Sequence, residues 1–312
     1  MTVSFCGLQL AHRVINGSGT FDAIAAWSVF GPALDEQFPF AAYVSKTITL
    51  EPREGNPPPR LWEAPGGLIN SIGLPNKGLD AYLAEDLPRL AALTRADGAG
   101  GVADRSWPPS APVPLITNVM GSSAEEFSRL VEACAARAEI AALELNVSCP
   151  NVATGLDIGA APATLEDVVR ATRARTGKPL IVKLTPNPAD VVACAQAAEA
   201  GGADAVSLIN TLRAMALAPR ARARPWLGGG TGGLSGPAVR AVALAQVAAV
   251  AAEVEIPVVG MGGVQSAAHA RALIDVGATL VAVGTENFCD PLAGARIARG
   301  LAETAPGSQS SA

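Results

Sequence analysis

The sequence predicts an α/β protein built on a (β/α)8 barrel of the TIM type, and three observations support this fold class. Short apolar segments recur along the 312 residues, and most of them are followed by a segment with a helical pattern. Strands that alternate with helices pair in parallel. Eight such units in about 300 residues are the number that closes a barrel. A doubly wound open sheet is the structural alternative, although eight strand-and-helix units fit it less well than they fit a barrel.

The predicted strands are short and apolar, and the predicted helices are amphipathic or rich in alanine. The strands cover residues 13–16, 41–46, 114–119, 142–146, 180–184, 205–210, 256–260 and 280–284. The segments between them predict helices that include 124–138, 165–175, 188–200, 237–254 and 266–276. Residues 5–10, before the first barrel strand, predict a small hairpin that closes the bottom of the barrel.

The chain is predicted to form one domain over residues 1–303, followed by a disordered tail over 304–312. Two connections, 47–113 and 211–255, are much longer than the usual ~2–6 residues. Both follow the carboxyl end of a strand, which is the active-site face of a barrel, so we expect these long loops to be functional. Residues 97–112 resemble an exposed insertion.

Composition and charge exclude several classes of protein. The net charge is −5 and no run of Lys or Arg occurs, which argues against a nucleic-acid surface. No apolar run reaches the ~18–20 residues of a membrane span, and the N-terminus has no signal-peptide pattern. The five cysteines are odd in number and irregularly spaced, so they predict neither disulfides nor a metal site. We therefore expect a reduced, cytoplasmic protein without a metal.

Polar side chains stand at the carboxyl ends of five predicted strands, where a purely structural strand would continue the apolar core. A single lysine in such a place is more often solvated than functional. Five polar residues at the same edge of five strands favour a functional site, of which they would form the polar floor. That floor suits a planar ring that offers donors and acceptors around its rim. Its residues are Lys46, Asn118, Asn146, Lys183 and Asn210.

Glycines follow the last two predicted strands, in Gly260-Met261-Gly262-Gly263 and Gly284-Thr285. In barrels the loops after these strands commonly bind phosphate through backbone N–H groups, which glycine allows to approach closely. One such loop alone would suit an ordinary turn, but two in the expected units predict a phosphate site. A planar amide-rich ring with a phosphate describes flavin mononucleotide (FMN). Lys183 or Lys46 would stabilise the reduced flavin by its charge.

Cys149 lies in the segment Asn146-Val147-Ser148-Cys149-Pro150-Asn151, which follows a strand. No second Cys or His stands at metal-ligand spacing, and no histidine partner supports a nucleophile. A lone cysteine before proline is structural more often than catalytic. Its place among carboxamides at a strand end favours a general base that takes a proton from a carbon acid.

Motifs along residues 14–290 resemble those of the class 1 dihydroorotate dehydrogenases, which are FMN barrels that oxidise dihydroorotate to orotate in pyrimidine biosynthesis. The motifs that carry the resemblance are Ser18-Gly19-Thr20, Lys46-Thr47 with Leu50-Glu51-Pro52-Arg53, Gly55-Asn56-Pro57-x-Pro59-Arg60, Asn70-x-Ile72-Gly73-Leu74-x-Asn76, residues 146–151 and Val182-Lys183-Leu184. One departure is Ala214, which stands where the family's pattern has a glycine. The segment 153–163 resembles the family's flexible lid over the substrate.

The resemblance implies a role for each matching residue. Cys149 would be the base that takes the C5 proton while the C6 hydride passes to flavin N5. The substrate would be held by Lys46, Asn70, Ile72, Gly73, Leu74, Asn146, Asn151, Asn210 and Thr211. FMN would be held by Ser18, Lys46, Thr47, Asn118, Asn146, Lys183 and Ile209, and its phosphate by Gly236, Gly262, Gly263, Gly284 and Thr285.

Within class 1, the segments 209–212, 231–237, 260–263 and 284–288 look most like the NAD-linked form (class 1B). That form implies a homodimer of this chain with an electron-transfer subunit that carries FAD and a [2Fe–2S] cluster and binds NAD, a heterotetramer in total. The alternative is the fumarate-reducing homodimer (class 1A). Two more distant alternatives are a Schiff-base aldolase that uses Lys183 or Lys46 without flavin, and a catalytically silent scaffold subunit.

Overall fold

Eight parallel strands form the centre of the molecule, as the sequence predicts. The structure, a computed structural model, describes residues 2–31, 38–94, 113–148, 158–219 and 223–303. Its central sheet has the order β3, β14, β13, β10, β9, β8, β7, β4, and the hydrogen-bonded neighbours are parallel. The strands are β3 (Val14–Asn16), β4 (Tyr43–Val44), β7 (Leu115–Val119), β8 (Ile140–Asn146), β9 (Leu180–Lys183), β10 (Ala205–Leu208), β13 (Val258–Met261) and β14 (Leu280–Val283). All eight predicted strands are present.

The side chain of Asn16 joins the two end strands of this sheet. Its Nδ2 group donates to the Val44 carbonyl (2.8 Å), and its Oδ1 atom accepts from the Val44 N–H (2.8 Å). The Ala41 N–H donates to the Val14 carbonyl (2.9 Å). A carboxamide carries both the donor and the acceptor of a peptide group, so Asn16 replaces a missing pair of backbone bonds. The sheet is thereby nearly closed into a barrel.

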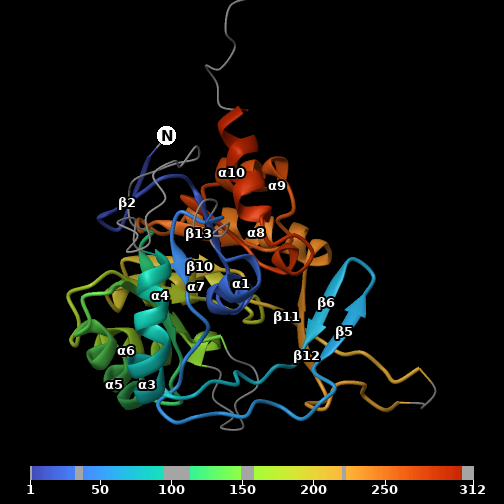
Figure 1. Ribbon diagram of the computed structural model, residues 1–312, viewed down its shortest axis with the longest axis horizontal. Helices are drawn as coiled ribbons and strands as arrows, with labels where there is room; N and C mark the ends of the chain where they lie inside the picture. The colour runs from blue at the N-terminus through green and yellow to red at the C-terminus, as the bar shows by residue number, and fades with distance from the viewer. Residues whose placement is uncertain (1, 32–37, 95–112, 149–157, 220–222, 304–312) are drawn as a thin grey trace, which may run out of the picture.

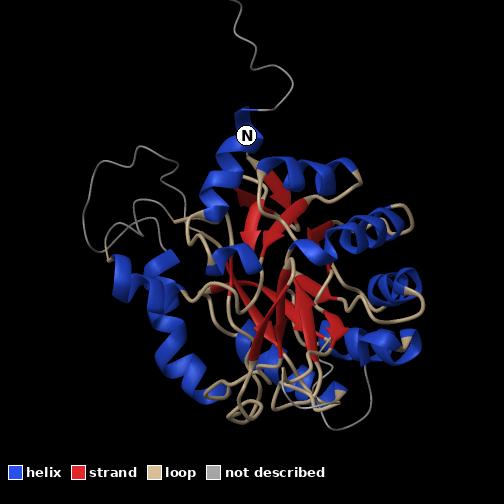
Figure 2. Cartoon of the chain, turned by 90° about the vertical axis from the view of Figure 1, so that its right-hand side faces the viewer, coloured by secondary structure: helices blue, strands red, loops and turns tan. Residues whose placement is uncertain are grey.

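Helices surround the strands (Figure 2), and the five segments that the sequence identified as helical are helical. They are α5 (Ala124–Ala135), α6 (Pro162–Arg173), α7 (Val191–Ala200), α8 (Arg240–Ala251) and α9 (Ala267–Asp275). The side chains of Ser123, Asp190 and Ser266 cap three of them by accepting a backbone N–H of the first turn. Further helices, which the sequence analysis did not name, are α1 (Ala23–Phe30), α3 (Leu79–Ala81) with its continuations η1 (Tyr82–Asp86) and α4 (Leu87–Thr94), and α10 (Ala293–Glu303).

The predicted hairpin at the start of the chain is confirmed. Strand β1 (Val3–Phe5) pairs antiparallel with β2 (Leu8–Leu10). Phe5 and Leu10 are each 1% exposed and belong to one buried cluster with inward-facing barrel residues such as Ile181. Each such side chain contributes about 1.5–3 kcal/mol when it is fully buried. The hairpin therefore acts as an apolar plug at the amino ends of the barrel strands.

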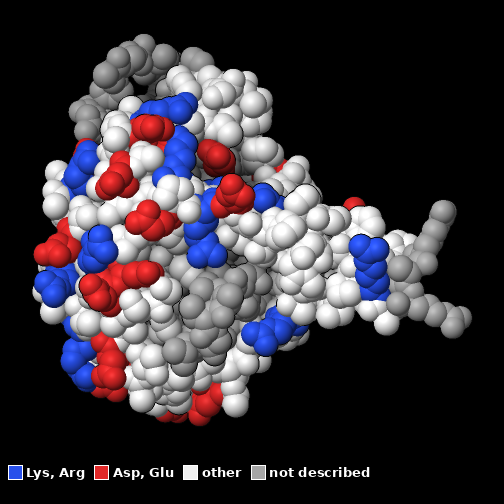
Figure 3. All heavy atoms as spheres, turned by 90° about the horizontal axis from the view of Figure 1, so that it is seen from below, with Lys and Arg blue, Asp and Glu red and all other residues white. Residues whose placement is uncertain are grey.

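The two long connections form a second sheet that the sequence analysis did not predict. Strands β5 (Leu61–Ala64) and β6 (Gly67–Asn70) come from the first connection, and β11 (Leu212–Ala214) and β12 (Gly232–Ser235) from the second. They pair antiparallel in the order β11, β12, β6, β5. We call these four strands the outer sheet. It projects from the body of the molecule in two perpendicular views (Figures 1 and 3).

Three predicted features lie outside the described residues: the insertion at 97–112, residues 153–157 of the lid, and the tail over 304–312. Ala214 is described and occupies a regular position in β11 opposite Gly232, so alanine is accommodated there in an extended strand. Among the helices that the structure describes, none has the length and apolar character needed to span a membrane.

Candidate active site

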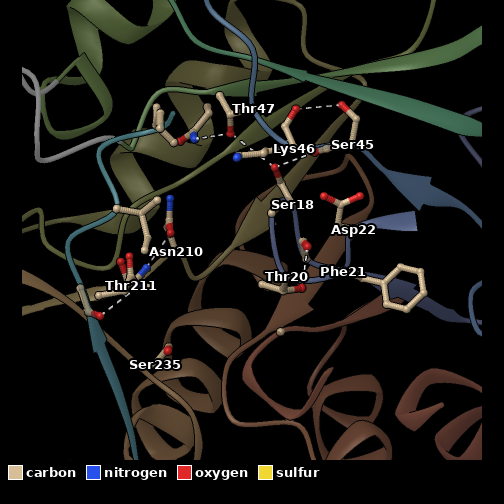
Figure 4. A pocket seen from close by; sticks show the side chains of 18 of the residues that line it. Ser18, Thr20, Phe21, Asp22, Ser45, Lys46, Thr47, Asn210, Thr211 and Ser235 are labelled. Atoms are coloured by element: carbon tan, nitrogen blue, oxygen red, sulfur yellow. Dashed lines mark hydrogen bonds between the residues drawn. The ribbon is translucent and has the colours of Figure 1, made fainter. Parts of the chain in front are cut away.

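A cavity of about 1220 Å³ opens at the carboxyl ends of the barrel strands. Barrel residues form its floor, and residues of the outer sheet form one wall. In the close view, Ser18, Lys46 and Thr47 lie together, and Asn210 and Thr211 lie beside them along the same cavity (Figure 4). The volume exceeds the ~300–1,000 Å³ of common small-molecule sites, so the cavity can hold a cofactor and a substrate together.

The cavity brings together most of the residues that the sequence analysis assigned to substrate or cofactor. They are Ser18, Lys46, Thr47, Asn70, Ile72, Gly73, Leu74, Asn146, Lys183, Ile209, Asn210, Thr211, Gly236, Gly262, Gly263, Gly284 and Thr285. The other three are Cys149 and Asn151, which lie outside the described residues, and Asn118, which is fully buried and is not among the lining residues.

The register of the barrel explains the position of Asn118. On β7 it pairs with Glu144 of β8, whereas the next floor residue, Asn146, pairs with Lys183 of β9. Parallel strands in a barrel are staggered, so strand ends that look equivalent in sequence lie at different heights. Asn118 therefore lies one layer below Asn146 in the barrel interior.

Hydrogen bonds link the floor residues into one chain of polar groups. The Asn146 Nδ2 group donates to Thr47 Oγ1 (3.2 Å), and Ser148 Oγ donates to Asn146 Oδ1 (2.8 Å). Asn210 Nδ2 in turn donates to Ser148 Oγ, and the Thr211 N–H donates to Asn210 Oδ1 (2.8 Å). These contacts fix which face of each carboxamide can meet a ligand. Such preorganisation costs no free energy at the moment of reaction.

Ser148 and Ser235 are site residues that the sequence analysis did not assign. Ser148 is 2% exposed and connects Asn146 to Asn210. Ser235 lines the cavity and its hydroxyl lies 2.9 Å from Thr285 Oγ1. Ser148 belongs to the motif at 146–151 and could have been found from its place between two carboxamides. Nothing in the sequence around Ser235 identifies it, because its partner is 50 residues away.

Two lysines bring positive charge to the floor. Lys183 is only 6% exposed, and Lys46 is exposed at the cavity. Within the described ranges, no carboxylate lies within the 4.0 Å of a salt bridge from either ammonium group. A buried ammonium without a contact ion pair is costly. The floor is therefore suited to an anionic or electron-rich ligand.

The glycine-rich end of the cavity leaves room for a ligand at the backbone. Gly236 has φ 92°, and a Cβ there would lie 2.9 Å from the Gly67 Cα atom, so only glycine fits. At Gly284 a Cβ would meet nothing closer than Thr20 Cγ2 at 3.8 Å; a side chain there would occupy the cavity itself. The short helices η3 (Pro237–Val239) and η4 (Thr285–Phe288) begin directly after these glycines, and neither start has a side-chain cap. At the start of η3, Pro237 has no N–H, and the N–H groups of Ala238 and Val239 donate to the Gly66 and Gly236 carbonyls. Of the two, the start of η4 is therefore the one suited to present N–H groups to an anion such as phosphate.

The wall of the cavity depends on close contacts between the two long connections. Asn70 Nδ2 donates to the Gly233 carbonyl (3.2 Å). A Cβ on Gly233 would lie 1.8 Å from Thr211 Oγ1, so the glycine lets the wall approach the floor. The turn at 72–74 is held by the bond from the Asn56 N–H to the Ile72 carbonyl (3.0 Å). Leu74 has φ 56°, an uncommon conformation for a residue with a side chain, which marks this turn as constrained.

Comparison with known proteins gives one consistent family. The family model described as "Dihydroorotate dehydrogenase" matches residues 1–304. The chain is 43% identical over 302 residues to the "Dihydroorotate dehydrogenase B (NAD(+)), catalytic subunit" of Pelobacter propionicus, covering 96% of this chain and 92% of that one. It is 44% identical over 300 residues to the protein of that name from Desulforudis audaxviator, covering 96% and 90%.

A solved structure shows the same fold at lower sequence identity. It is the DHODH from Eimeria tenella in complex with ferulenol, with a TM-score of 0.74 and 21% identity, covering 96% of this chain and 83% of that one. At this identity the likeness supports the barrel architecture alone.

Proposed function

The chain belongs to the dihydroorotate dehydrogenase family, and from this premise we propose that it oxidises dihydroorotate to orotate with bound FMN in pyrimidine biosynthesis. The observation that carries the proposal is the joint presence, in one cavity, of a carboxamide floor, two lysines and a glycine-rich end. Neither lysine has a contact ion pair with any residue that the structure describes. These three features are what the ring system, the reduced charge and the phosphate of FMN require. The proposal places the cofactor in one domain over residues 1–303.

The residues present fit FMN on two structural points. Gly284 leaves open space where any side chain would stand, at the end of the cavity that we assign to phosphate. Lys183 is a buried cation that has no carboxylate of the described residues within contact distance, and it lies at the floor that we assign to the ring. Bound FMN would accept the hydride from C6 of dihydroorotate.

The chain's own residues would bind, orient and deprotonate the substrate. Asn146 and Asn210 present amide groups whose orientation is fixed by Ser148 and Thr47, so they can hold the planar amide edge of dihydroorotate. Lys46 would neutralise the substrate's carboxylate. Cys149, which directly follows Ser148 in the sequence, would take the C5 proton as general base while the hydride leaves C6. Asn151 is proposed as a further substrate contact.

The relatives' name contains the words "catalytic subunit", and this supports a partner for the present chain. We assign to that partner the FAD, the [2Fe–2S] cluster and the NAD site, with a homodimer of this chain at the centre of a heterotetramer. Electrons would pass from FMN through the partner to NAD⁺. The cytoplasmic location expected from the cysteine content belongs to the same proposal.

The test begins with the purified chain. We expect yellow protein that releases FMN on denaturation and whose flavin is reduced by dihydroorotate without oxygen. Colourless protein that FMN cannot reconstitute would overturn the proposal and favour an aldolase or a scaffold. The partner is tested separately: the chain alone should reduce NAD⁺ poorly and artificial acceptors well. Efficient NAD⁺ reduction without a partner, or turnover with fumarate, would contradict the two-subunit assignment alone.

A further inference from the structure

Glu144 and Lys183 are the only charged side chains that are buried among the residues the structure describes. Glu144 is 4% exposed and Lys183 is 6% exposed. They stand on neighbouring strands, β8 and β9, and both face the barrel interior, since each alternates with an inward apolar residue, Ala142 or Ile181. Two buried charges of opposite sign, one in the floor of the proposed flavin site and one below it, are an unusual feature of a barrel core.

The contacts of Glu144 place its carboxylate under Lys183. Its Oε2 atom accepts from Asn118 Nδ2 on β7, and its Oε1 atom accepts from Ser207 Oγ on β10 (2.7 Å). Strand β9 lies between β8 and β10 in the sheet, and Ser207 pairs in register with Lys183. A carboxylate that reaches both β7 and β10 must therefore lie on the interior side of β9, the strand that carries Lys183.

The two hydrogen bonds do not neutralise the charge of Glu144. Asn118 and Ser207 are neutral donors, and no described basic group lies within 4.0 Å of the carboxylate. A buried ion is stable only when an opposite charge or a strong polar network compensates its desolvation. Coulomb attraction falls only as the inverse of distance and is weakly screened in a protein interior. Lys183 is the buried cation in position to supply the opposite charge that Glu144 needs.

Glu144 also determines how Asn118 presents its amide. A carboxylate can only accept hydrogen bonds, so the NH₂ side of the Asn118 amide must face Glu144. Asn118 Oδ1 then points elsewhere, and it is buried without a hydrogen-bond partner in the described part of the chain. A buried carbonyl without a partner is rare in a folded protein, and Asn118 holds it one layer below the cavity floor.

We propose that Glu144 is a positioning residue for the flavin site: its buried carboxylate is the counter-charge of Lys183 and fixes the orientation of the Asn118 amide beneath the cavity floor. The inference rests on the proposed function, because it concerns the same cofactor. Its consequence is electrostatic. A negative charge below the ring opposes the build-up of negative charge on reduction, so Glu144 offsets part of the effect of Lys183 and keeps the reduction potential of FMN low.

Replacing Glu144 with Gln tests the charge while the contacts are kept. The Gln side chain can accept from Asn118 and donate to the Ser207 hydroxyl. We expect E144Q to retain FMN and to favour the reduced flavin at least ~10-fold more than the wild type, which is about 30 mV for a two-electron couple. E144D, which keeps the charge, should lie closer to the wild type. The control is E132Q, which removes an exposed carboxylate from α5 and should leave the potential unchanged.

A second measurement, on protein freed of flavin, keeps the proposal testable if E144Q is unstable. If the charges compensate each other, the unfolding free energies of E144Q, K183M and the double variant will be non-additive, with the double variant more stable than the sum of the single losses predicts. Additive losses of unfolding free energy would overturn the proposal that Glu144 is the counter-charge of Lys183. An E144Q chain that does not fold, and that K183M does not rescue, would overturn it as well.

The outcomes also separate this inference from the proposed function. A wild-type chain that binds no FMN removes the proposed function. A wild-type chain that binds FMN, together with an E144Q variant of unchanged potential, removes only the role of Glu144.

Discussion

The floor of the cavity and the outer sheet are built in different ways. The floor comes from parallel strands such as β7, β8, β9 and β10, which follow one another along the chain and are packed on both faces. The outer sheet joins β6 to β12, and the bond from Asn70 to Gly233 spans 163 residues. Its own buried core consists of Ile69, Ala216 and Leu227. One region is a rigid part of the main core, and the other is held by a small cluster of its own.

The cavity floor and the outer sheet also differ in what they contribute to the site. The floor holds the charged and amide groups, Lys183, Glu144 and Asn146, whose orientation must not vary. The outer sheet supplies backbone, glycines and Asn70, which bring the wall close to the floor. Because local stability follows the number of buried apolar contacts, the wall is the part that can yield to let a substrate enter. We therefore expect changes at the barrel end to alter chemistry and changes in the outer sheet to alter binding.

The largest effect should follow from Cys149→Ala, on the barrel side of this comparison. FMN should remain bound, and reduction of the flavin by dihydroorotate should slow by ~10²-fold or more, the usual worth of a general base. Rapid mixing of the variant with dihydroorotate under anaerobic conditions measures this rate. A near-native rate would remove Cys149 from the mechanism and leave the floor with binding functions only.

The barrel could be predicted from the sequence because its signals are local. An apolar run such as Leu180–Val182 and the polar Lys183 that ends it are visible within a few residues. The outer sheet could not be predicted in this way, since β6 and β12 are short, rich in glycine and have their partners far along the chain. A pattern search within one segment cannot detect a pairing between two loops that lie far apart in the sequence.

The candidate site shows the same limit on a finer scale. Residues at strand ends were found by their place after an apolar run, and the cavity contains Lys46, Lys183 and Asn210 as expected. Asn118 met the same criterion but lies a layer lower, because the stagger between strands is fixed by the barrel and not by any one strand. Glu144 lies between Leu143 and Leu145, and the sequence analysis assigned it no role. Its contacts with Asn118 and Ser207 exist only in the folded barrel.

A smaller effect should follow from Gly233→Ala, which tests the wall. The added Cβ would stand 1.8 Å from Thr211 Oγ1 and 2.4 Å from Thr211 Cβ, so the wall or Thr211 must move. Overpacking of this kind costs about 1–3 kcal/mol, and we expect orotate to bind ~10-fold or more weakly while FMN is retained. Titration with orotate, followed by the flavin spectrum, measures the change.

Gly177→Ala is the matched control, because an added Cβ there meets no atom within 4 Å. It should leave orotate binding unchanged. If Gly233→Ala instead released FMN and left orotate affinity intact, the wall would serve the cofactor, and the division of tasks between floor and wall would be wrong.

Acid should lower the stability of the fold through protonation of His12, at the amino-terminal end of the barrel. Burial, with a smaller effect of the N-terminal amine, lowers the pKa of His12 from 6.5 to about 4, and its Nδ1 atom accepts from the Val14 N–H (3.2 Å). His12 therefore binds a proton below about pH 6.5 in the unfolded chain, but only below about pH 4 in the folded chain. Stability is complete above pH 6.5 and is lost as the pH falls, by about 1 kcal/mol at pH ~5.5.

Urea unfolding of the wild type and of His12→Gln at pH ~7.5 and ~5.5 isolates this contribution. The variant keeps a side-chain acceptor for Val14 but cannot titrate, so its loss of stability on acidification should be smaller by that amount. Equal losses in both proteins would show that His12 is already accessible to protons in the folded barrel.

The smallest effect should follow from Trp62→Leu, which loosens the outer sheet from within. Trp62 on β5 meets Trp226 edge to face, with ring centroids 5.4 Å apart, and both pack against the small cluster around Ile69. An aromatic pair contributes about 0.5–1.5 kcal/mol beyond its buried area, and leucine keeps part of that area. We expect faster amide exchange in β5, β6, β11 and β12 and unchanged exchange in β8 and β9. If exchange accelerated equally in the barrel strands, the two sheets would unfold as one unit, and the outer sheet could not yield independently to admit a substrate.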